Sequence, residues 1–424
     1  MTTNFNGSDL KFVVESGGMI GAVSLISPTT GRPDLGLVVQ PRFPWDGLGP
    51  LLAEMGWVVS PKPLTLPLVP RSERKVPHWV LATVVLRRLA VLLDSLEKRF
   101  ELIDEIRNAP RGSIDWGTYL TSKLPRALFL SVPCRYPVLQ ENTDLLGAIR
   151  FTLERQIRSL ETQRSRGTFV QRLLSSAEAL HRRVADIPVK PPSARDIERW
   201  KRSPVITPSV REGVEAIEWT VEERGLGGLS ELNGLAWNMS MSDFFEAWVE
   251  TVLRKVARSV GGQLKTGRRR ETVAPLRWDP PFSGSQRSLV PDFRLELESA
   301  AVIIDAKYKR HWEELVDRKW AAQDESLREE HRADLFQALA YANLARSRSV
   351  VTCLVYPCTL QTWQSLCARD RVFQEAELPA GDRQIRVWLT ALPMQAAVDD
   401  AARPFTSRVL QLSQEVREDS LVIP

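Results

Sequence analysis

The sequence predicts an α/β protein whose N-terminal half is an α+β region with strands and long helices. Residues 289–309 form two apolar-alternating runs around a small turn, a pattern typical of a β-hairpin. Apolar residues recur at helical spacing in segments 245–256 and 332–346, on either side of this hairpin. The apolar run 349–356 then reads as a buried strand, so helices and strands alternate through the C-terminal half.

The hairpin brings charged residues together at one end of one face. If residues 299–300 form the loop, Asp292 on the first strand lies opposite Lys307 on the second. Directly paired residues project to the same face, with Cβ atoms about 5 Å apart. Because side chains alternate along a strand, Asp305 shares this face with Lys307, and apolar residues of both strands gather on the other face. Local pairing therefore predicts a cluster of two carboxylates and one ammonium group.

Two close carboxylates repel each other, unless one takes up a proton or a cation lies between them. Oxygen ligands of this kind suit Mg²⁺ or Mn²⁺, which keep several waters and accept phosphate oxygens. A nearby lysine can orient an activated water or neutralise charge on an attacked phosphorus. The pattern therefore predicts a divalent-metal site. The alternative is a solvated hairpin whose acids and lysines are ordinary surface charges.

The motif Pro291-Asp292 followed by Asp305-Ala306-Lys307 resembles the PD-(D/E)xK nuclease superfamily. The resemblance implies a mixed central sheet flanked by helices, in the order helix, strand, strand, helix, strand. It also implies that Asp292 and Asp305 are metal ligands in phosphodiester hydrolysis, and that Lys307 positions or activates the attacking water.

Two helices supply further candidates on the same resemblance. That fold usually takes another acid from the preceding helix, and Glu246 beside the apolar stripe of residues 245–256 is the candidate metal or water ligand. A solvated helix acid is the alternative. A glutamine in the helix after the hairpin recurs in several branches of the superfamily, so Gln337 is expected to contact DNA or support the active site.

Basic residues lie close to the predicted acidic site in the sequence. A metal held by carboxylates leaves the phosphate backbone to be neutralised by lysine and arginine side chains. The expected DNA contacts are Lys265, Arg268, Arg269, Arg270 and Lys309. A solvated loop is the alternative for the run at 265–270. In the charge-dense insert 311–332, His311 and His331 are expected at the surface rather than as metal ligands.

The N-terminal half contains apolar runs punctuated by Gly, Pro and Thr, followed by segments with helical periodicity. The expected strands are Lys11–Glu15, Met19–Ile26 and Leu35–Gln40, and the expected helices lie near Leu48–Met55, Pro77–Arg107 and Leu145–Leu180, the last interrupted at Arg164–Gly167. The Pro-rich stretch 188–208 is the best linker candidate. We therefore expect an N-terminal α+β domain at 1–187, a connecting segment at 188–230 and a C-terminal domain at 231–424. The resemblance above implies that the C-terminal domain is the nuclease domain, and the resemblance given next implies that the N-terminal domain is partner-binding.

Three N-terminal signatures look like those of the McrC family, the nuclease subunits of modification-dependent restriction systems. They are a Val-Val-Gln-Pro strand at 38–41, an Arg-Gly-Ser-Ile turn at 111–114 and a Glu-Asn pair at 141–142 before a helix. The resemblance covers about residues 10–185 and 240–360. It implies a partner, a separate AAA+ GTPase or ATPase that translocates DNA.

Composition is consistent with a globular protein of two or three domains, with 424 residues of which 43% are hydrophobic. A formal net charge of +5 permits a polyanion partner. Four cysteines are too sparse for a disulfide scaffold. The N-terminus lacks the pattern of a signal peptide, and no apolar run is long enough to span a bilayer. We therefore expect a cytoplasmic protein without membrane contact.

The leading interpretation is a Mg²⁺-dependent endonuclease subunit that cuts double-stranded DNA in a prokaryotic restriction or anti-phage system. The sequence has no GxxxxGK[ST] motif, so a motor NTPase would be a separate protein. Two other interpretations stay open. One is a free-standing or helicase-coupled PD-(D/E)xK nuclease, and the other is a non-catalytic adaptor that stimulates a partner ATPase.

Overall fold

The computed structural model describes most of the chain. The described residues are 2–6, 9–13, 17–33, 35–67, 69, 77–96, 99–140, 143–202, 207–222, 234–298, 300–309, 312, 325–345, 349–380 and 383–421. Expectations for residues 14–15, 141–142, 203–206, 223–233, 299, 310–311, 313–324 and 346 lie outside them. No helix in the described part combines the length and apolar character needed to cross a membrane.

The chain divides into two compact units. The first comprises Met1–Pro77, Arg166–Phe169 and Leu226–Pro424, and the second comprises His78–Ser165 and Val170–Gly225. This division differs from the expected boundaries at residues 187 and 230. The reason is strand pairing, because β9 (Trp237–Ser240) lies in one sheet with strands from the N-terminal segment.

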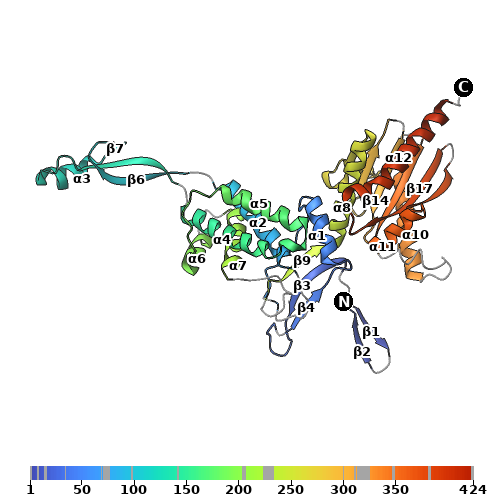
Figure 1. Cartoon of the computed structure of the whole chain (residues 1–424), viewed down its shortest axis with the longest axis horizontal. Helices are drawn as coiled ribbons and strands as arrows, with labels where there is room; N and C mark the ends of the chain where they lie inside the picture. Colours follow the sequence, from blue (N-terminus) through green and yellow to red (C-terminus); the bar gives the residue numbers. More distant parts are fainter. Residues whose placement is uncertain are drawn as a thin grey trace. The chain divides into compact units, whose positions relative to one another are not determined.

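A six-stranded mixed sheet forms the centre of the first unit (Figure 1). Its strands in spatial order are β10 (Gln263–Thr266), β13 (Phe293–Glu296), β14 (Ala300–Ala306), β15 (Ser349–Cys358), β17 (Arg383–Pro393) and β16 (Phe373–Ala380). The pairs β14–β15 and β15–β17 are parallel and the other three pairs are antiparallel. The mixed α/β class is confirmed, and so is the buried strand at 349–356.

Helices pack against this sheet. Helix α10 (Glu325–Ala342) lies against β14, β15 and β17, and its Tyr341 and Ala342 join an apolar cluster with alternate residues of those strands. Helix α8 (Met241–Val260) lies against β10, β13 and β14 and also contacts α12 (Val398–Leu421). The short helix α11 (Leu360–Ala368) contacts β17. Together these helices cover the sheet whose strand ends carry the predicted site.

The sequence of α8 accounts for its two ends. Ser240 caps the N-terminus, where its hydroxyl accepts a hydrogen bond from the backbone N–H of Asp243 at 3.1 Å. Gly261 ends the helix with φ of 69°, a left-handed conformation that glycine adopts without the steric penalty of a Cβ atom. Between these caps the apolar stripe is buried, as helical spacing predicts.

The β13–β14 hairpin has a different register from the expected one. Phe293 pairs with Ile304 and Glu296 pairs with Ala301, so the expected pair Asp292–Lys307 is wrong by two residues. The turn is wider than expected, with the backbone N–H of Leu297 donating to the carbonyl of Ala300 at 2.9 Å. A shift of two residues preserves which face each side chain occupies, so the predicted apolar and charged faces are retained.

The N-terminal segment forms a second, antiparallel sheet in the same unit. Its order is β4 (Leu35–Val39), β3 (Met19–Leu25), β9 and β5 (Lys62–Pro63), and helix α1 (Trp45–Glu54) follows β4 in the chain. The strands β1 (Thr2–Asn6) and β2 (Asp9–Val13) form a separate hairpin. The expected strands near 19–26 and 35–40 and the helix near 48–55 are confirmed to within a few residues.

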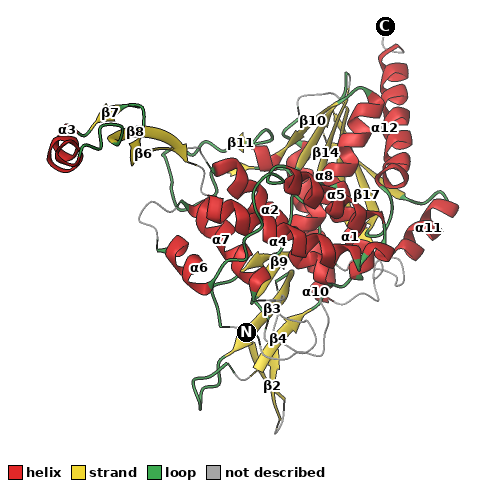
Figure 2. Ribbon diagram, turned by 60° about the vertical axis from the view of Figure 1, so that its left-hand side comes forward, coloured by secondary structure: helices red, strands yellow, loops and turns green. Residues whose placement is uncertain are grey.

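The second unit is mainly helical. It contains α2 (His78–Ser95), α4 (Thr143–Glu161), most of α5 (Thr168–Arg182), α6 (Ala194–Lys201) and α7 (Pro208–Val221). Helices α2, α4 and α7 pack together (Figure 2). A 3₁₀ turn, η3 (Arg164–Arg166), separates α4 from α5, as the sequence predicts.

The segment expected to connect the domains instead contains two packed helices. Ser193 and Asp196 form a capping box at the start of α6, and Thr207 caps α7. The apolar side chains Ile197 and Trp200 of α6 are buried, as are Val214 and Ile217 of α7. Proline at 208 is compatible with a helix because it occupies the first turn, where its missing N–H needs no intrahelical partner.

A β-ribbon extends from this unit, and we call residues 99–140 the arm (Figure 1). Strands β6 (Arg99–Arg107) and β8 (Val132–Gln140) pair antiparallel, and β7 (Ser113–Ile114) adds to β8. The expected helix through Arg107 is therefore wrong beyond Ser95. The expected bend at Arg111-Gly112 is present, with Gly112 at φ of 71° and too close to the Arg135 carbonyl to accept a Cβ atom.

The arm carries three short helical turns, α3 (Trp116–Thr118), η1 (Tyr119–Lys123) and η2 (Leu124–Arg126). Large apolar side chains on and after these turns are 43–72% exposed. We call them the apolar tip: Trp116, Leu120, Leu124, Leu128, Phe129 and Leu130.

Candidate active site

Asp292 and Asp305 face each other at one end of the β13–β14 pair. Continuing the observed register by one residue places Asp292 opposite Asp305, so both carboxylates lie on the same face of the sheet. The Oδ2 atom of Asp292 accepts a hydrogen bond from the backbone N–H of Ala306 at 2.8 Å. The carbonyl of Asp292 accepts a second one, from the backbone N–H of Gly267 at 2.7 Å. These contacts fix Asp292 beside the end of β14.

Lys307 extends from the end of β14 into the same cluster. Its backbone N–H donates to the carbonyl of Val355 at 2.8 Å, which holds the chain against β15. Its ammonium nitrogen lies 2.5 Å from Oδ2 of Asp305 and donates to Oε1 of Gln337 at 2.7 Å. The amide nitrogen of Gln337 donates to the hydroxyl of Tyr341 at 2.7 Å. Gln337 therefore orients Lys307 from α10, and the predicted proximity of these residues is present.

Burial and mutual repulsion dominate the electrostatics of the two acids. Asp305 is only 4% exposed. Burial and the neighbouring charge of Asp305 raise the pKa of Asp292 to about 8, against the lowering effects of the Ala306 N–H and Lys307. In the absence of a cation the site therefore holds a proton on this pair near neutral pH.

Lys307 is fully charged at neutral pH. Burial lowers the pKa of its ammonium, but the carboxylates of Asp305, Asp334 and Asp292 raise it by more, so the net pKa lies above the usual value. A lysine with a raised pKa is a fixed positive charge and a hydrogen-bond donor rather than a proton acceptor.

Glu246 lies on α8 within the electrostatic range of the two acids. Burial raises the pKa of Glu246, Arg268 opposes this shift, and the charge of Asp305 adds to it. The Oε1 atom of Glu246 is 3.7 Å from Nε of Arg268, whose guanidinium also donates to the carbonyl of Asp243 at 3.4 Å. Glu246 thus stands beside the cluster of Asp292 and Asp305, with a positive charge as its nearest ionic partner.

The basic residues expected to contact DNA fall into two groups. Lys265 pairs with Glu296 at 2.7 Å, and Lys309 pairs with Asp334 at 2.8 Å, so acids partly neutralise both. Arg268, Arg269 and Arg270 lie in and after the 3₁₀ turn η4 (Gly267–Arg269), where all three are exposed.

A buried polar group behind Lys309 has no counterpart in the sequence expectations. The hydroxyl of Tyr356 donates to Oδ2 of Asp334 at 3.2 Å and lies 3.4 Å from Nδ1 of His331. The expectation that His331 is a surface residue is wrong, because this side chain is only 6% exposed and burial lowers its pKa. Helical spacing could have brought two of its members together, since His331 and Asp334 lie three residues apart on α10.

The carboxylate oxygens of the site can be compared with the ligands that a divalent cation prefers. Within the described residues, no three His, Cys, Asp or Glu side chains converge closely enough to form a metal cage. The facing carboxylates of Asp292 and Asp305 are oxygen ligands of the kind that Mg²⁺ accepts, with waters or phosphate oxygens completing its shell. The Oδ2 atom of Asp305 is buried and has the ammonium of Lys307 as its ionic partner at 2.5 Å. These two acids therefore fit a small hard cation.

The similar solved structures include two from Thermococcus gammatolerans. One is a half-complex of McrB AAA+ hexamers with bound McrC, at 14% identity and a TM-score of 0.45, covering 97% of this chain and 85% of that chain. The other is the McrBC complex, at 15% identity and a TM-score of 0.26, covering 56% of this chain and 66% of that chain. No curated protein matches the sequence significantly.

Comparison with protein families gives one match, which includes the predicted site. Residues 222–357 match the family described as McrBC 5-methylcytosine restriction system component. This region contains α8, the β13–β14 hairpin, α10 and nearly all of β15. The match agrees with the McrC-like character that the sequence predicts, and over residues 222–357 the chain is similar to the McrBC family of restriction components.

Proposed function

We propose that the chain is the Mg²⁺-dependent DNA endonuclease subunit of a prokaryotic restriction or anti-phage system, built on a PD-(D/E)xK core. One observation carries the proposal: Asp292 and Asp305 face each other across β13 and β14, and Lys307 pairs with Asp305. Charged groups are rarely buried, and clusters of ionisable groups whose pKa values are shifted by burial and by one another concentrate at functional sites. The family match supports a role in restriction.

Asp292 and Asp305 would hold the cation, with Glu246 as an outer ligand or a ligand to water. When bound, Mg²⁺ or Mn²⁺ supplies Lewis-acid stabilisation of the attacked phosphate. The hydrogen bond from Ala306 to Asp292 fixes one carboxylate oxygen, which leaves the other oxygen of that side chain for the cation. The chain thus provides a preorganised pair of ligands that needs little rearrangement.

Lys307 would act as a fixed positive charge. Its raised pKa keeps the ammonium protonated, so it can orient a water molecule or stabilise negative charge on the phosphate as the bond to phosphorus forms. Gln337 holds this ammonium through its amide oxygen, and Tyr341 in turn holds the amide nitrogen of Gln337. Gln337 is therefore assigned as a positioning residue, which contacts DNA only if the strand reaches α10.

The exposed arginines of η4 would neutralise the DNA backbone near the cut. Arg268 is one of these arginines and also pairs with Glu246, so a phosphate bound by Arg268 would lie close to the candidate metal site. Lys265 and Lys309 are paired with Glu296 and Asp334, and each can contribute to phosphate binding only while sharing its charge with that acid.

We further propose that a separate AAA+ NTPase is the partner and that the arm binds it. The solved complex at 14% identity contains McrB AAA+ hexamers with bound McrC. In this chain the apolar tip exposes six large side chains on a narrow ribbon, and contiguous exposed apolar surface marks interaction sites. The absence of a GxxxxGK[ST] motif from the sequence agrees with a motor on another chain.

The direct test is plasmid cleavage by the full chain with Mg²⁺, on methylated and unmodified DNA, with and without the AAA+ protein encoded beside it. Asp305→Ala and Lys307→Ala are expected to abolish cleavage while the fold and partner binding are retained. Glu298→Ala is a matched control, because this acid lies in the same hairpin but its side chain is 84% exposed. Cutting by both site variants would overturn the assignment.

The same experiment separates the other interpretations. Cleavage that does not require the AAA+ protein would favour a free-standing nuclease. Stimulation of the partner's NTPase without cleavage of any DNA would favour an adaptor.

A further inference from the structure

A loop of aromatic residues leads into the strand segment that carries Asp292. Residues 276–287 connect β11 (Ala274–Pro275) with β12 (Ser288–Leu289), which pair antiparallel. The backbone N–H of Leu276 donates to the carbonyl of Arg287 at 2.8 Å and closes the base of the loop. The indole N–H of Trp278 donates to the carbonyl of Gln286 at 2.9 Å. This bond satisfies the polar edge of the indole and leaves its ring face free for contact.

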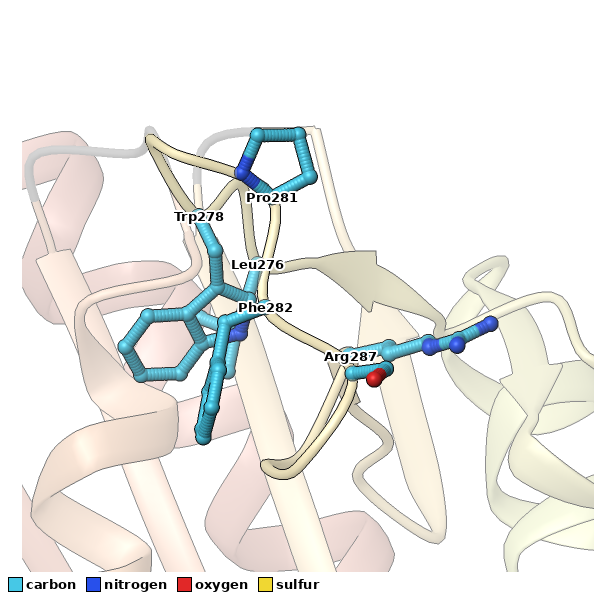
Figure 3. A pocket seen from close by; sticks show the side chains of 6 residues that line it. Leu276, Trp278, Pro281, Phe282 and Arg287 are labelled. Atoms are coloured by element: carbon cyan, nitrogen blue, oxygen red, sulfur yellow. The ribbon is translucent and has the colours of Figure 1, made fainter.

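The loop forms an open surface pocket of about 300 Å³, lined by Leu276, Trp278, Pro281, Phe282, Ser283 and Arg287 (Figure 3). Trp278 and Phe282 project beside each other, with ring centroids 6.3 Å apart and planes at 73°. Their exposures are 44% and 57%. Two large rings that remain half exposed contribute little to the core, and they form a surface on which a flat group can stack.

The charge of the pocket favours an anionic ligand. No carboxylate is among its lining residues, and the charged side chain among them is that of Arg287. Figure 3 shows the guanidinium of Arg287 pointing away from the two rings. The pocket therefore has an aromatic side and, a short distance away, a cationic side. A nucleotide has the same construction, since a flat base and an anionic phosphate are joined by a sugar.

The pocket is tied to the candidate active site through a short segment of backbone. Arg287 precedes Asp292 by five residues, which span at most about 17 Å when extended. The hydroxyl of Thr272 donates to the carbonyl of Pro291 at 2.6 Å and anchors this segment next to Asp292. At 3.4 Å per base along a strand, about five nucleotides cover that span. A segment of about five nucleotides would therefore connect a phosphate beside Asp292 with a base in the pocket.

We propose that this pocket binds an unpaired nucleotide of the DNA strand, with its base stacked on the face of one of the two rings and edge-on to the other, and its phosphate beside Arg287. This proposal rests on the proposed nuclease function and specifies the form of DNA that the site holds. Aromatic stacking tolerates any base, because every base has a π-face, so the pocket contributes affinity for single-stranded segments without reading sequence.

The test measures binding without cleavage. The full chain is titrated in EDTA against a fluorescein-labelled oligonucleotide of twelve thymidines and against an abasic oligonucleotide of the same length, by fluorescence anisotropy. Loss of base stacking weakens single-strand binding by about 5- to 150-fold. The wild-type chain should therefore bind the thymidine oligonucleotide at least about fivefold more tightly than the abasic one.

Variants then assign this preference to the pocket. Trp278→Ala combined with Phe282→Ala should bind both oligonucleotides equally, while Trp278→Phe should keep most of the preference. Phe336→Ala is the matched control, because this ring is 69% exposed on α10 and should not affect either affinity. Arg287→Gln should weaken both complexes and reduce the salt dependence by about one phosphate contact. Thermal unfolding of each variant checks that the fold is retained.

Three results would overturn the proposal. They are equal affinity of the wild-type chain for both oligonucleotides, no binding of either, and a preference that survives loss of both rings. Loss of association with the AAA+ protein in the double variant, with base preference unchanged, would show a protein contact instead. Cleavage of plasmid DNA by a chain without base preference would retain the nuclease and reject the pocket. A chain that prefers the thymidine oligonucleotide but never cleaves DNA would retain the pocket and reject the nuclease.

Discussion

The end of the β13–β14 pair and the tip of the arm depart from ordinary side-chain partition in opposite ways. At the strand ends the carboxylate of Asp305 is 4% exposed, although such groups are rarely buried without partners. At the tip Phe129 and Leu130 are 61% and 72% exposed, although such side chains usually fill a core. One region takes charge out of water and the other leaves apolar surface in it.

The two regions differ in whether the same protein supplies the partners of these side chains. Within the same unit Asp305 pairs with Lys307, whose ammonium also donates to Gln337, and Asp292 accepts a hydrogen bond from the Ala306 N–H. A small cation with its waters would complete this set of partners. The apolar tip is stabilised by local hydrogen bonds, such as that from the hydroxyl of Tyr119 to the carbonyl of Phe129 at 3.0 Å. These bonds satisfy polar groups but cover no apolar area, so another protein surface is the expected partner. Variants of the two regions should therefore affect different properties.

The largest effect is expected from Asp292→Asn, which should abolish cleavage and yet stabilise the metal-free protein at pH 8. The pKa of Asp292 is raised to about 8 in the folded state, so the fold favours the protonated carboxyl. Its contribution to the free energy of unfolding is fully present below pH 4 and is lost as pH rises through 8. Asparagine can still accept the Ala306 hydrogen bond without carrying charge. We expect the variant to be more stable by roughly 2 kcal/mol or more, since one pKa unit corresponds to about 1.4 kcal/mol.

This prediction is checked by chemical unfolding in EDTA at pH 5 and pH 8. The gap between variant and wild type should widen with pH, and Mg²⁺ should stabilise the wild type alone. Glu298→Gln provides the comparison, because this exposed acid should give no pH-dependent gap. A variant less stable than the wild type at pH 8 would show that Asp292 is ionised and well compensated in the metal-free fold.

An intermediate effect is expected from the combined change Phe129→Ser and Leu130→Ser. Both side chains are exposed, so the free energy of unfolding should change by less than about 0.5 kcal/mol. Stimulation of the AAA+ partner's NTPase should fall by about tenfold or more, because a few well-packed side chains carry most of the binding free energy of an interface. Leu410→Ser, an exposed apolar change on α12, should leave stimulation intact. Full stimulation by the double variant would remove the arm as the docking element.

The hairpin illustrates how far sequence reasoning reaches. Alternation assigned each side chain of β13 and β14 to the correct face, and therefore predicted that Asp292, Asp305 and Lys307 lie together. It could not fix the register, because a shift by two residues leaves every face unchanged and only the turn distinguishes the alternatives. The hairpin has the wider turn, which places Asp292 opposite Asp305 instead of Lys307.

Elements that depend on distant partners were harder to predict. The sequence predicts a helix through Arg107. The segment Arg99–Arg107 instead pairs with β8, from Arg99 opposite Gln140 to Arg107 opposite Val132, and this pairing makes it a strand. The charge-dense sequence around His331 predicts a surface position, but its partner Tyr356 lies on another element and buries it. Gln337 was identified from a resemblance, and its contact with Lys307 depends on how α10 packs against the sheet. Local pattern thus located the charged groups, and tertiary packing supplied their second partners.

The smallest effect is expected from Tyr356→Phe, which tests whether the polar group behind Lys309 is purely structural. Removing the hydroxyl deletes the hydrogen bond to Asp334, and loss of one such buried bond costs about 1–2 kcal/mol. This loss contrasts with the gain expected at Asp292, because here the polar groups satisfy one another. Cleavage should fall by less than about tenfold, since Asp334 contacts Lys309 directly but lies 3.9 Å from the ammonium of Lys307. A variant that folds with wild-type stability but has lost cleavage would instead place Tyr356 among the residues that position Lys307.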